Sequence, residues 1–246
     1  MDIRNKIDID IPLEFRITRP VECPYLDGRM EQRLAVDING KARHYDTLAK
    51  AGFRRVENWV YKPICSSCSA CLPIRIPSGD GKLGDLKISR NQRRVLNRNK
   101  DLTRRILPNN NSEEHFALFR TYLQHRHEDG QMAEMDEDSY SAMICSSPIE
   151  TVLVEYRLKD QVAGVMLLDL QDDGLSAVYS FFDPNLSDRS LGMFMVLDVA
   201  AIALMMDLPF VYLGYYIEHS QKMNYKKRFK PAEALINGIW TPLTDL

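Results

Sequence analysis

The sequence of 246 residues lacks a long uncharged apolar run. Its first eight residues, Met-Asp-Ile-Arg-Asn-Lys-Ile-Asp, carry charges where a signal peptide has an apolar core. Its most apolar segment, residues 193–206, is about 14 residues long, and a membrane-spanning helix needs roughly 18 to 20. We therefore expect a cytoplasmic protein that has no membrane partner.

The sequence also has little net charge and few cysteines. The formal net charge is −2, so no global field points to nucleic acid. Five cysteines is an odd number, and four of them lie within residues 1–71. In a reducing compartment this clustering favours metal binding or free thiols over a disulfide framework.

Two basic segments are hidden by the near-neutral total. Residues 87–105 hold eight Lys or Arg against one acid, and residues 222–230 hold five with no acid. Most charge runs are simply solvated. Two such runs with few interleaved acids nevertheless favour an RNA backbone, which Arg and Lys hold without reading its sequence. The predicted RNA contacts are Arg90, Arg93, Arg94, Arg98, Lys227 and Arg228.

Hydrophobic periodicity predicts an α+β or α/β fold. The first half has predicted strands at 12–18, 33–38, 53–61 and 72–76 and helices at 43–50 and 89–106. The polar stretch 108–111 predicts a boundary between domains 1–108 and 112–246. Beyond it we expect a helix from Ser112, a helix at 139–144, strands at 151–157, 162–170 and 175–182, a helix at 193–206, a strand at 210–216 and a final helix. Three strands, a crossover helix and one more strand are typical of acetyltransferase-like (GNAT) domains.

The cysteines Cys65, Cys68 and Cys71 are separated by two residues each, and Cys23 lies upstream. Such spacers let neighbouring sulfurs converge, so these four thiols are candidate ligands for Zn²⁺ or an iron–sulfur cluster. Ordinary buried thiols are the alternative.

A carboxylate, Asp183, follows the strand at 175–182 and precedes the helix that starts near Gly192. Helix N-termini attract anions, so this sheet edge is a candidate site. Asp183 also fits a simple turn residue before Pro184.

Several motifs together resemble the aminoacyl-tRNA–protein transferases, the arginyltransferase family. The residues that carry the resemblance are Tyr179-x3-Asp183-Pro184, Ser190-Leu191-Gly192, Gly214-Tyr-Tyr-Ile217, Lys222-Met223-x-Tyr225-Lys226-x2-Phe229-x-Pro231, Cys23-x-Tyr25, Gly52-Phe-Arg-Arg55, Tyr61-Lys62-Pro63 and Arg75. The short length and the form Cys23-Pro-Tyr-Leu26 resemble the bacterial aspartate/glutamate leucyltransferase branch. The longer eukaryotic enzymes usually have a second cysteine where Leu26 stands.

The resemblance implies a pair of GNAT-like halves and an aminoacyltransferase. Such an enzyme moves an amino acid, here leucine, from aminoacyl-tRNA to the α-amine of proteins that begin with Asp or Glu, and so marks them for degradation by the N-degron pathway. It implies no cofactor for the chemistry, since the ester is already activated. The partners are then leucyl-tRNA and these acceptor proteins.

The resemblance also suggests roles for single residues. Asp183 would orient the attacking ammonium and take its proton, and Tyr225 and Lys226 would stabilise the oxyanion or hold the terminal adenosine. Arg54, Arg75 or Lys222 would bind the acidic side chain of the acceptor. The predicted substrate-binding residues are Arg54, Tyr61, Lys62, Arg75, Tyr179, Ser190, Gly192 and Lys222.

Other functions remain open at this point. Arginine is an alternative donor residue. A GNAT enzyme that uses acetyl-CoA fits Arg189-x-x-Gly192, but Phe194 stands where a second small residue is usual in such enzymes. A non-enzymatic RNA- or metal-binding module is the third possibility.

Overall fold

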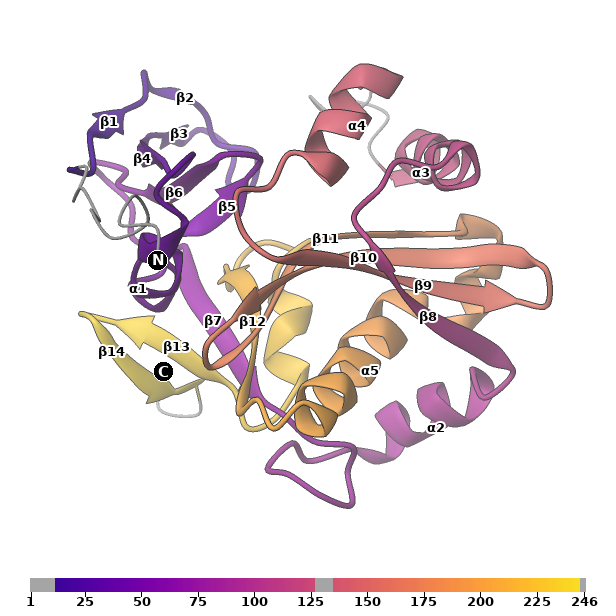
Figure 1. The fold of residues 1–246 in the computed structure, drawn as a ribbon. Helices are drawn as coiled ribbons and strands as arrows, with labels where there is room; N and C mark the ends of the chain where they lie inside the picture. The colour runs from indigo at the N-terminus through magenta and orange to yellow at the C-terminus, as the bar shows by residue number, and fades with distance from the viewer. Residues whose placement is uncertain (1–11, 127–134, 244–246) are drawn as a thin grey trace, which may run out of the picture.

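The computed structural model describes residues 12–126 and 135–243. It is a mixed α/β protein built around one sheet of eight strands, in the spatial order β14-β13-β7-β12-β11-β10-β9-β8 (Figure 1). The strands are β7 Leu72–Pro77, β8 Leu102–Pro108, β9 Thr151–Leu158, β10 Gln161–Gln171, β11 Gly174–Phe182, β12 Phe210–Tyr216, β13 Glu233–Ile236 and β14 Ile239–Pro242. The predicted α/β class is therefore confirmed.

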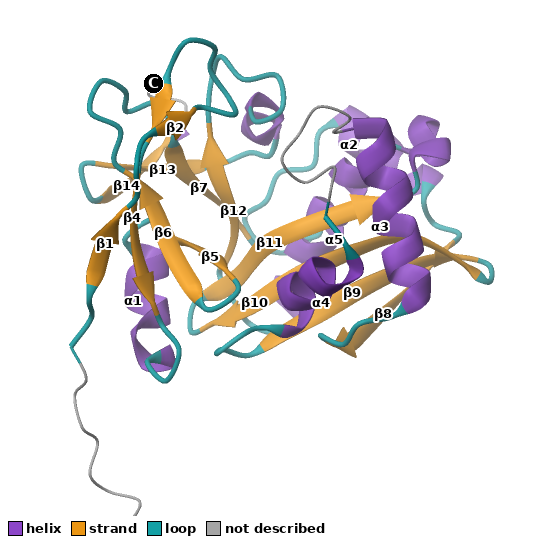
Figure 2. Ribbon diagram, turned by 90° about the horizontal axis from the view of Figure 1, so that it is seen from above, coloured by secondary structure: helices purple, strands orange, loops and turns teal. Residues whose placement is uncertain are grey.

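Helices cover both faces of this sheet (Figures 1 and 2). Helices α3 (Glu113–Arg126) and α4 (Glu137–Cys145) lie on one face, and helices α2 (Arg90–Arg98) and α5 (Leu191–Met205) lie on the other. Met195, Val199 and Ala203 of α5 are 0% exposed, as expected for a helix that is apolar on every side. No helix in the two described ranges has the length and apolar character that a membrane crossing requires.

The unit β11–α5–β12 is a parallel crossover, which confirms the strands predicted at 175–182 and 210–216. The short helix η3 (Pro184–Arg189) joins β11 to α5. Residues 174–176 pair with residues 210–212, and no pairing between the two strands follows. On its other side β12 shifts register against β7, between Tyr212 and Tyr215, and Gly214 has a φ of +76° there. The pairing of β11 with β12 therefore ends at Tyr212, just before Gly214.

A second, antiparallel sheet in the order β1-β4-β6-β5 lies beside the large one (Figure 2). Its strands are β1 Phe15–Ile17, β4 Arg33–Asp37, β5 Arg54–Val56 and β6 Trp59–Pro63. Helix α1 (Tyr45–Lys50), preceded by η2 (Ala42–His44), packs its Tyr45 and Leu48 against Val36 and Val60. A short ribbon, β2 (Val21–Glu22) with β3 (Met30–Glu31), completes this part.

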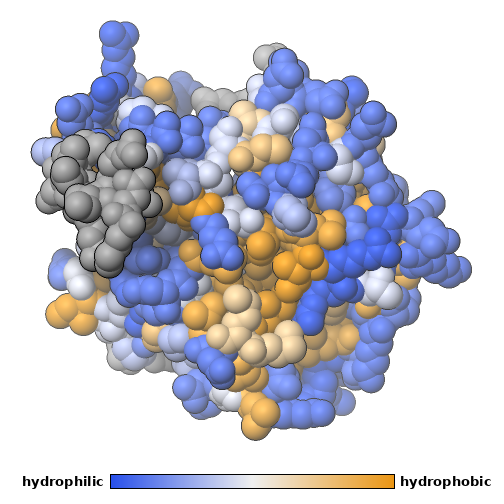
Figure 3. Space-filling model, in the orientation of Figure 1, coloured by the Kyte–Doolittle hydropathy of each residue, from blue (hydrophilic) through white to orange (hydrophobic). Residues whose placement is uncertain are grey.

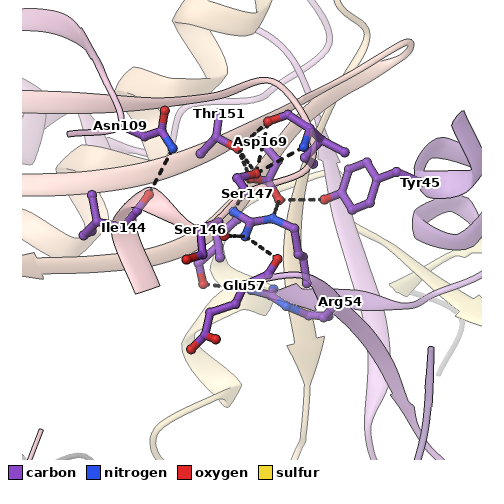
Figure 4. Close-up of polar contacts among 12 residues, drawn as sticks. Tyr45, Arg54, Glu57, Asn109, Ile144, Ser146, Ser147, Thr151 and Asp169 are labelled. Atoms are coloured by element: carbon purple, nitrogen blue, oxygen red, sulfur yellow. Dashed lines mark hydrogen bonds and ion pairs between the residues drawn. The ribbon is translucent and has the colours of Figure 1, made fainter. Parts of the chain in front are cut away.

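A buried ion pair joins the two sheets (Figure 4). Arg55 of β5 donates from Nε and Nη2 to the two carboxylate oxygens of Asp169 on β10, at 2.7 and 2.6 Å. Tyr45 and Thr151 donate hydroxyl protons to the same carboxylate, at 2.8 and 3.0 Å. Asp169 of β10 thus holds β5 of the small sheet, helix α1 and the start of β9.

The large sheet also crosses the position where the sequence predicts a domain boundary. Strands β7 and β8 lie within residues 1–108, yet β7 pairs with β12 and β8 pairs with β9. The order of elements predicted for residues 112–216 is confirmed. After residue 216 the chain forms a short helix, η4 (Asn224–Arg228), and then the hairpin β13–β14, which was not predicted.

Two element predictions are wrong in detail. The helix expected over 89–106 ends at Arg98, because Asn99 donates to the carbonyls of Val95 and Arg189, and residues 102–108 pair with β9 as a strand. The strand expected over 53–61 is a hairpin, because Glu57 adopts a φ of +51° and begins a two-residue turn between β5 and β6.

Candidate functional site

Arg54 of β5 reaches the place where β11 and β12 separate. Its Nη2 donates to the backbone oxygens of Ala177 and Val178, each at 3.0 Å. Its guanidinium lies so close to Gly214 that a Cβ added there would come 1.5 Å from Nη1. The absence of a side chain at Gly214 therefore gives Arg54 its position beside β12.

Lys226 of η4 is buried next to this arginine. Its side chain donates from Nζ to the backbone oxygen of Tyr215 at 2.6 Å and to Sδ of Met223 at 3.3 Å. Burial, and after it the positive charge of Arg54, lowers the pKa of Lys226 to about 7. Near neutral pH, both the ammonium and the amine form of Lys226 are populated.

The two cations have no carboxylate partner in the described part of the chain. Their hydrogen bonds go to backbone oxygens and a thioether. Other inward cations are neutralised: Arg55 pairs with Asp169, and Arg33 pairs with Glu31 at 2.5 Å. A desolvated positive charge without a counter-ion is costly, so Arg54 and Lys226 form a site that attracts an anion.

Aromatic residues line one side of this cation pair. Tyr61, predicted to bind substrate, packs its ring 6.4 Å from the ring of Tyr215, and Arg33 lies 4.5 Å over it. Tyr215 donates its hydroxyl proton to the backbone oxygens of Gly52 and Tyr61. Arg33 was not among the predicted site residues. It begins the strand expected at 33–38, and the acid Glu31 two residues before it is the only sequence feature that could have indicated its role.

Asp183 lies away from these cations. One carboxylate oxygen, Oδ1, accepts hydrogen bonds from the backbone and side-chain nitrogens of Asn185, both at 2.9 Å, and so caps η3. A strand advances about 3.3 Å per residue, so Asp183 lies roughly 16 Å along β11 from Val178. The structure thus does not bring Asp183 and Arg54 together.

Arg75 of β7 is engaged by its neighbours. Its Nε lies 2.7 Å from the carboxylate of Glu233, and its guanidinium lies 3.6 Å from the ring centre of Phe210 and 4.4 Å from that of Trp240. Since this charge already has a counter-ion and two aromatic faces, Arg54 is the better candidate for binding an external carboxylate.

The remaining predicted substrate residues are dispersed. Lys62 donates to the backbone oxygen of Ala51 at 3.0 Å, and Lys222 is exposed. The ring of Tyr179 packs against the α3 side of the sheet, in the same cluster as Phe119. Ser190 precedes α5 with a φ of +53°, and Gly192 lies in the first turn of α5. Tyr225, which was predicted to be catalytic, lies on η4 and packs edge-on against Phe229.

The two basic segments meet in space, through residues that lie 136 positions apart in the sequence. Gln92 of α2 donates from Nε2 to the backbone oxygen of Arg228 at 3.0 Å, and the backbone N–H of Lys87 donates to the carbonyl of Lys230 at 2.7 Å. The surface over α2 is hydrophilic (Figure 3). Most of the predicted RNA contacts are exposed there: Arg90, Arg93, Arg94, Lys227 and Arg228. Arg98 is exposed too and donates to the carbonyl of Asp188.

Comparison with known proteins gives the family. Two family models match: arginine-tRNA-protein transferase, N terminus, over residues 21–94, and arginine-tRNA-protein transferase, C terminus, over residues 114–236. The chain belongs to this family.

Its curated relatives carry a more specific name, aspartate/glutamate leucyltransferase. The relative from Ruegeria sp. (strain TM1040) is 47% identical over 96% of this chain and 86% of its own length. The relatives from Gluconacetobacter diazotrophicus and Ruegeria pomeroyi are 45% and 44% identical, over 94% and 96% of this chain and 88% and 86% of their own lengths. The recognition made from motifs is therefore confirmed.

A solved structure, the C-terminal domain (DUF2156) of a lysylphosphatidylglycerol synthetase from Agrobacterium fabrum, has a TM-score of 0.43 and 12% identity to this chain. It covers 72% of this chain, which in turn covers 51% of it. This similarity is too low to define fold or activity.

The four predicted metal ligands of this family member lie near one another. Cys23, Cys65, Cys68 and Cys71 line one pocket, together with Glu31 and others. Burial, and then the neighbouring thiols, raises the pKa of Cys71 to about 12, so its thiol is neutral. No group of three or more His, Cys, Asp or Glu within 12–126 and 135–243 is arranged to hold a metal ion. A zinc or iron–sulfur site at these four cysteines therefore stays a prediction.

Proposed function

We propose that this protein transfers leucine from leucyl-tRNA to the α-amine of proteins that begin with Asp or Glu, which marks them for degradation. The observation that carries the proposal is the cation pair Arg54 and Lys226, which lacks a carboxylate partner in the described residues. The family and the name of the curated relatives support the same reaction.

The chemistry needs little from the protein. The amine nitrogen of the acceptor attacks the ester carbon, an amide C–N bond forms, the C–O bond to the tRNA ribose breaks, and the proton passes from the amine to the ribose oxygen. An α-amine has a pKa of about 7.7 to 8.0 and is partly neutral near pH 7. Holding amine and ester in contact can supply roughly 7 to 11 kcal/mol.

The acidic side chain of the acceptor binds at Arg54 in this proposal. Nη2 of Arg54 already serves two carbonyls, so a carboxylate here meets a single donor, Nε or Nη1, and not a two-pronged fork. Lys226 adds positive potential behind it, and a bound carboxylate favours its charged form. An acceptor with a neutral first side chain gains nothing from this pair.

The tRNA binds along α2 and η4 in this proposal. Gln92 ties the start of α2 to η4, so the exposed arginines and lysines of both segments form one surface. Such contacts neutralise phosphates and give a salt-dependent affinity with no base specificity.

Asp183, Tyr225 and the metal remain predictions. Oδ1 of Asp183 is used by Asn185, so the other oxygen, Oδ2, is the one that would accept a proton. If Asp183→Asn leaves transfer unchanged in a folded protein, Asp183 has no catalytic role. No step of the reaction is derived through zinc or an iron–sulfur cluster, since attack of an amine on an activated ester needs neither.

The helix-covered part of the sheet is GNAT-like in this proposal, and the parallel β11–α5–β12 unit supports this fold. A GNAT-like fold of the N-terminal half stays a prediction.

Acetyl-CoA is a weaker alternative substrate. The guanidinium of Arg54 occupies the place where β11 and β12 separate, and Phe194 is a core residue packed on Tyr156.

The test is transfer of labelled amino acid from leucyl-tRNA, and separately from arginyl-tRNA, to a peptide that begins with Asp. A peptide that begins with Ala is the control. Leucine incorporation confined to the Asp peptide is the expected result. Arginine incorporation would change the donor, and no incorporation from either tRNA would overturn the proposal.

A further inference from the structure

The end of helix α2 and the turn η3 hold each other by hydrogen bonds to backbone carbonyls. Nδ2 of Asn99, the residue after α2, donates to the carbonyl of Arg189 at 2.9 Å, and Arg98 donates to the carbonyl of Asp188. In return, Nη1 of Arg189 donates to the carbonyl of Arg98 at 3.2 Å. The partners lie 90 or 91 positions apart in the sequence, so the fold alone brings them together.

An ion pair closes the same contact. The guanidinium of Arg189 meets both carboxylate oxygens of Asp101, at 2.7 and 2.9 Å, in the two-pronged geometry that arginine favours. Asp101 is largely exposed, so this pair alone contributes little to stability. Asn99, in contrast, is buried, and its amide also donates to the carbonyl of Val95 in α2. We refer to Arg98, Asn99, Asp101, Asp188 and Arg189 as the α2–η3 clamp.

The clamped turn joins several of the predicted site residues. Asp183 caps its start, Ser190 ends it, and Gly192 follows in the first turn of α5. Ser190 has a φ of +53°, a left-handed conformation that residues other than glycine keep only where their surroundings impose it. The clamp holds Arg189, the residue directly before Ser190, and so supports this conformation.

The arginines of α2 differ in what they contact. Arg98 donates to the turn, whereas the exposed side chains of Arg93 and Arg94 make no hydrogen bond or ion pair with residues 12–126 and 135–243. Arg93 and Arg94 are therefore available for phosphates. Arg98 would have to share its guanidinium, or release the carbonyl of Asp188, to bind one.

We propose that the α2–η3 clamp positions the turn from Asp183 to Ser190 for the transfer step, and that Arg98 acts in this clamp rather than as a tRNA contact. The inference rests on the proposed function. Arg98 and Arg189 are then positioning residues, which act through the turn and touch no substrate. Since the helix that binds tRNA phosphates also holds this turn, a bound tRNA and the turn keep a fixed spacing.

Matched variants of α2 separate the two possible roles of Arg98. Arg93→Met and Arg98→Met each remove one exposed cation from the same helix. Loss of a phosphate contact reduces the slope of log affinity against log salt by about one. We expect this reduction for Arg93→Met and none for Arg98→Met. Arg98→Met should instead lower the single-turnover rate constant for leucine transfer to an Asp peptide by at least about tenfold, because misplacement slows the reaction without weakening binding.

The single-turnover rate constant distinguishes positioning from a loss of folded protein. With saturating protein in excess over leucyl-tRNA, it reports the folded molecules alone, so a merely structural role for Arg98 leaves it unchanged. An unchanged rate constant for Arg98→Met, or a salt slope reduced as in Arg93→Met, would overturn the inference.

Arg189 tests the clamp from its other side and covers the case in which Arg98→Met does not fold. Arg189→Met removes the fork to Asp101 and the donor to the carbonyl of Arg98, and it changes no residue of α2. We expect a similar fall in the rate constant with an unchanged salt slope. Because both residues act on one turn, the double variant should lose less than the product of the two single losses. Losses that multiply would mean independent roles and would contradict the clamp.

The unmodified protein separates failure of this inference from failure of the proposed function. If it transfers no leucine, the proposed function fails. If it transfers leucine while Arg98→Met behaves like Arg93→Met, only this inference fails.

Discussion

The guanidinium of Arg54 occupies the space that a side chain at Gly214 would fill, since an added Cβ would lie 1.5 Å from Nη1. Gly214→Ala should therefore displace Arg54 and weaken binding of an acidic acceptor by at least about tenfold, equivalent to roughly 1.4 kcal/mol. The measurement is kcat/KM for leucine transfer to an Asp peptide.

Gly238→Ala is the matched control for this change. Gly238 has a φ of +81°, close to the +76° of Gly214, but an added Cβ would meet nothing within 4 Å. Both variants carry the left-handed strain of an L residue, about 1–2 kcal/mol. If the two variants lose stability and activity alike, the displacement of Arg54 is not the cause.

The ion pair of Arg55 and Asp169 should dominate the attachment of the small sheet. The two side chains are 1% and 0% exposed. Asp169→Asn removes the charge and leaves a buried arginine uncompensated, which costs about 3–5 kcal/mol. Urea unfolding should show this loss. The exposed pair of Lys50 and Asp172 gives the control, because Asp172→Asn should cause no measurable change. A loss as small as that of the control would contradict the assigned role of Asp169.

Local patterns explain why much of the fold could be predicted. The apolar run of α5 and the turns around it identify β11, α5 and β12 from neighbouring residues alone. The turn at Glu57 was missed because it contains no glycine or proline, and the end of α2 was missed because Asn99 takes one partner, Arg189, from 90 positions away.

The site depends still more on contacts distant in sequence. Arg54, Lys226 and Arg75 were all named as candidates, but the sequence does not separate them. Arg75 is neutralised by Glu233, 158 positions away, while Arg54 contacts carbonyls more than 120 positions away and has no counter-ion in the described residues. Which cation stays available is decided by tertiary packing, which residue spacing does not encode.

The lowered pKa of Lys226, to about 7, predicts a pH-dependent stability. Between about pH 7 and pH 10 the unfolded chain holds the proton, while the folded protein has released it. The contribution of Lys226 to the free energy of unfolding therefore rises with pH across that window, by at most about 1.4 kcal/mol per pH unit. This gain is lost as the pH falls to 7. From pH 7 to pH 9, the unfolding free energy of the unmodified protein should rise relative to that of Lys226→Met. A difference that stays constant would place Lys226 in a solvated environment.

Metal removal should leave the reaction intact. The ester of leucyl-tRNA is already activated, so the chemistry described needs no metal. We expect dialysis against a chelator to leave the rate of leucine transfer unchanged. A loss of rate that added Zn²⁺ restores would show that the four cysteines rearrange around a metal.

The basic surface predicts a salt-dependent effect on tRNA binding alone. Replacing Arg93 and Arg94 of α2 by Ala should raise KM for leucyl-tRNA and reduce the slope of log affinity against log salt by about one for each phosphate that is no longer neutralised. Binding of the acceptor peptide should not change, because both side chains are exposed on α2, whereas Arg54 contacts β11 and β12. Arg120→Ala is the control, since Arg120 is exposed on α3, across the sheet from α2. An equal effect of Arg120→Ala would mean that the tRNA responds to total charge rather than to this surface.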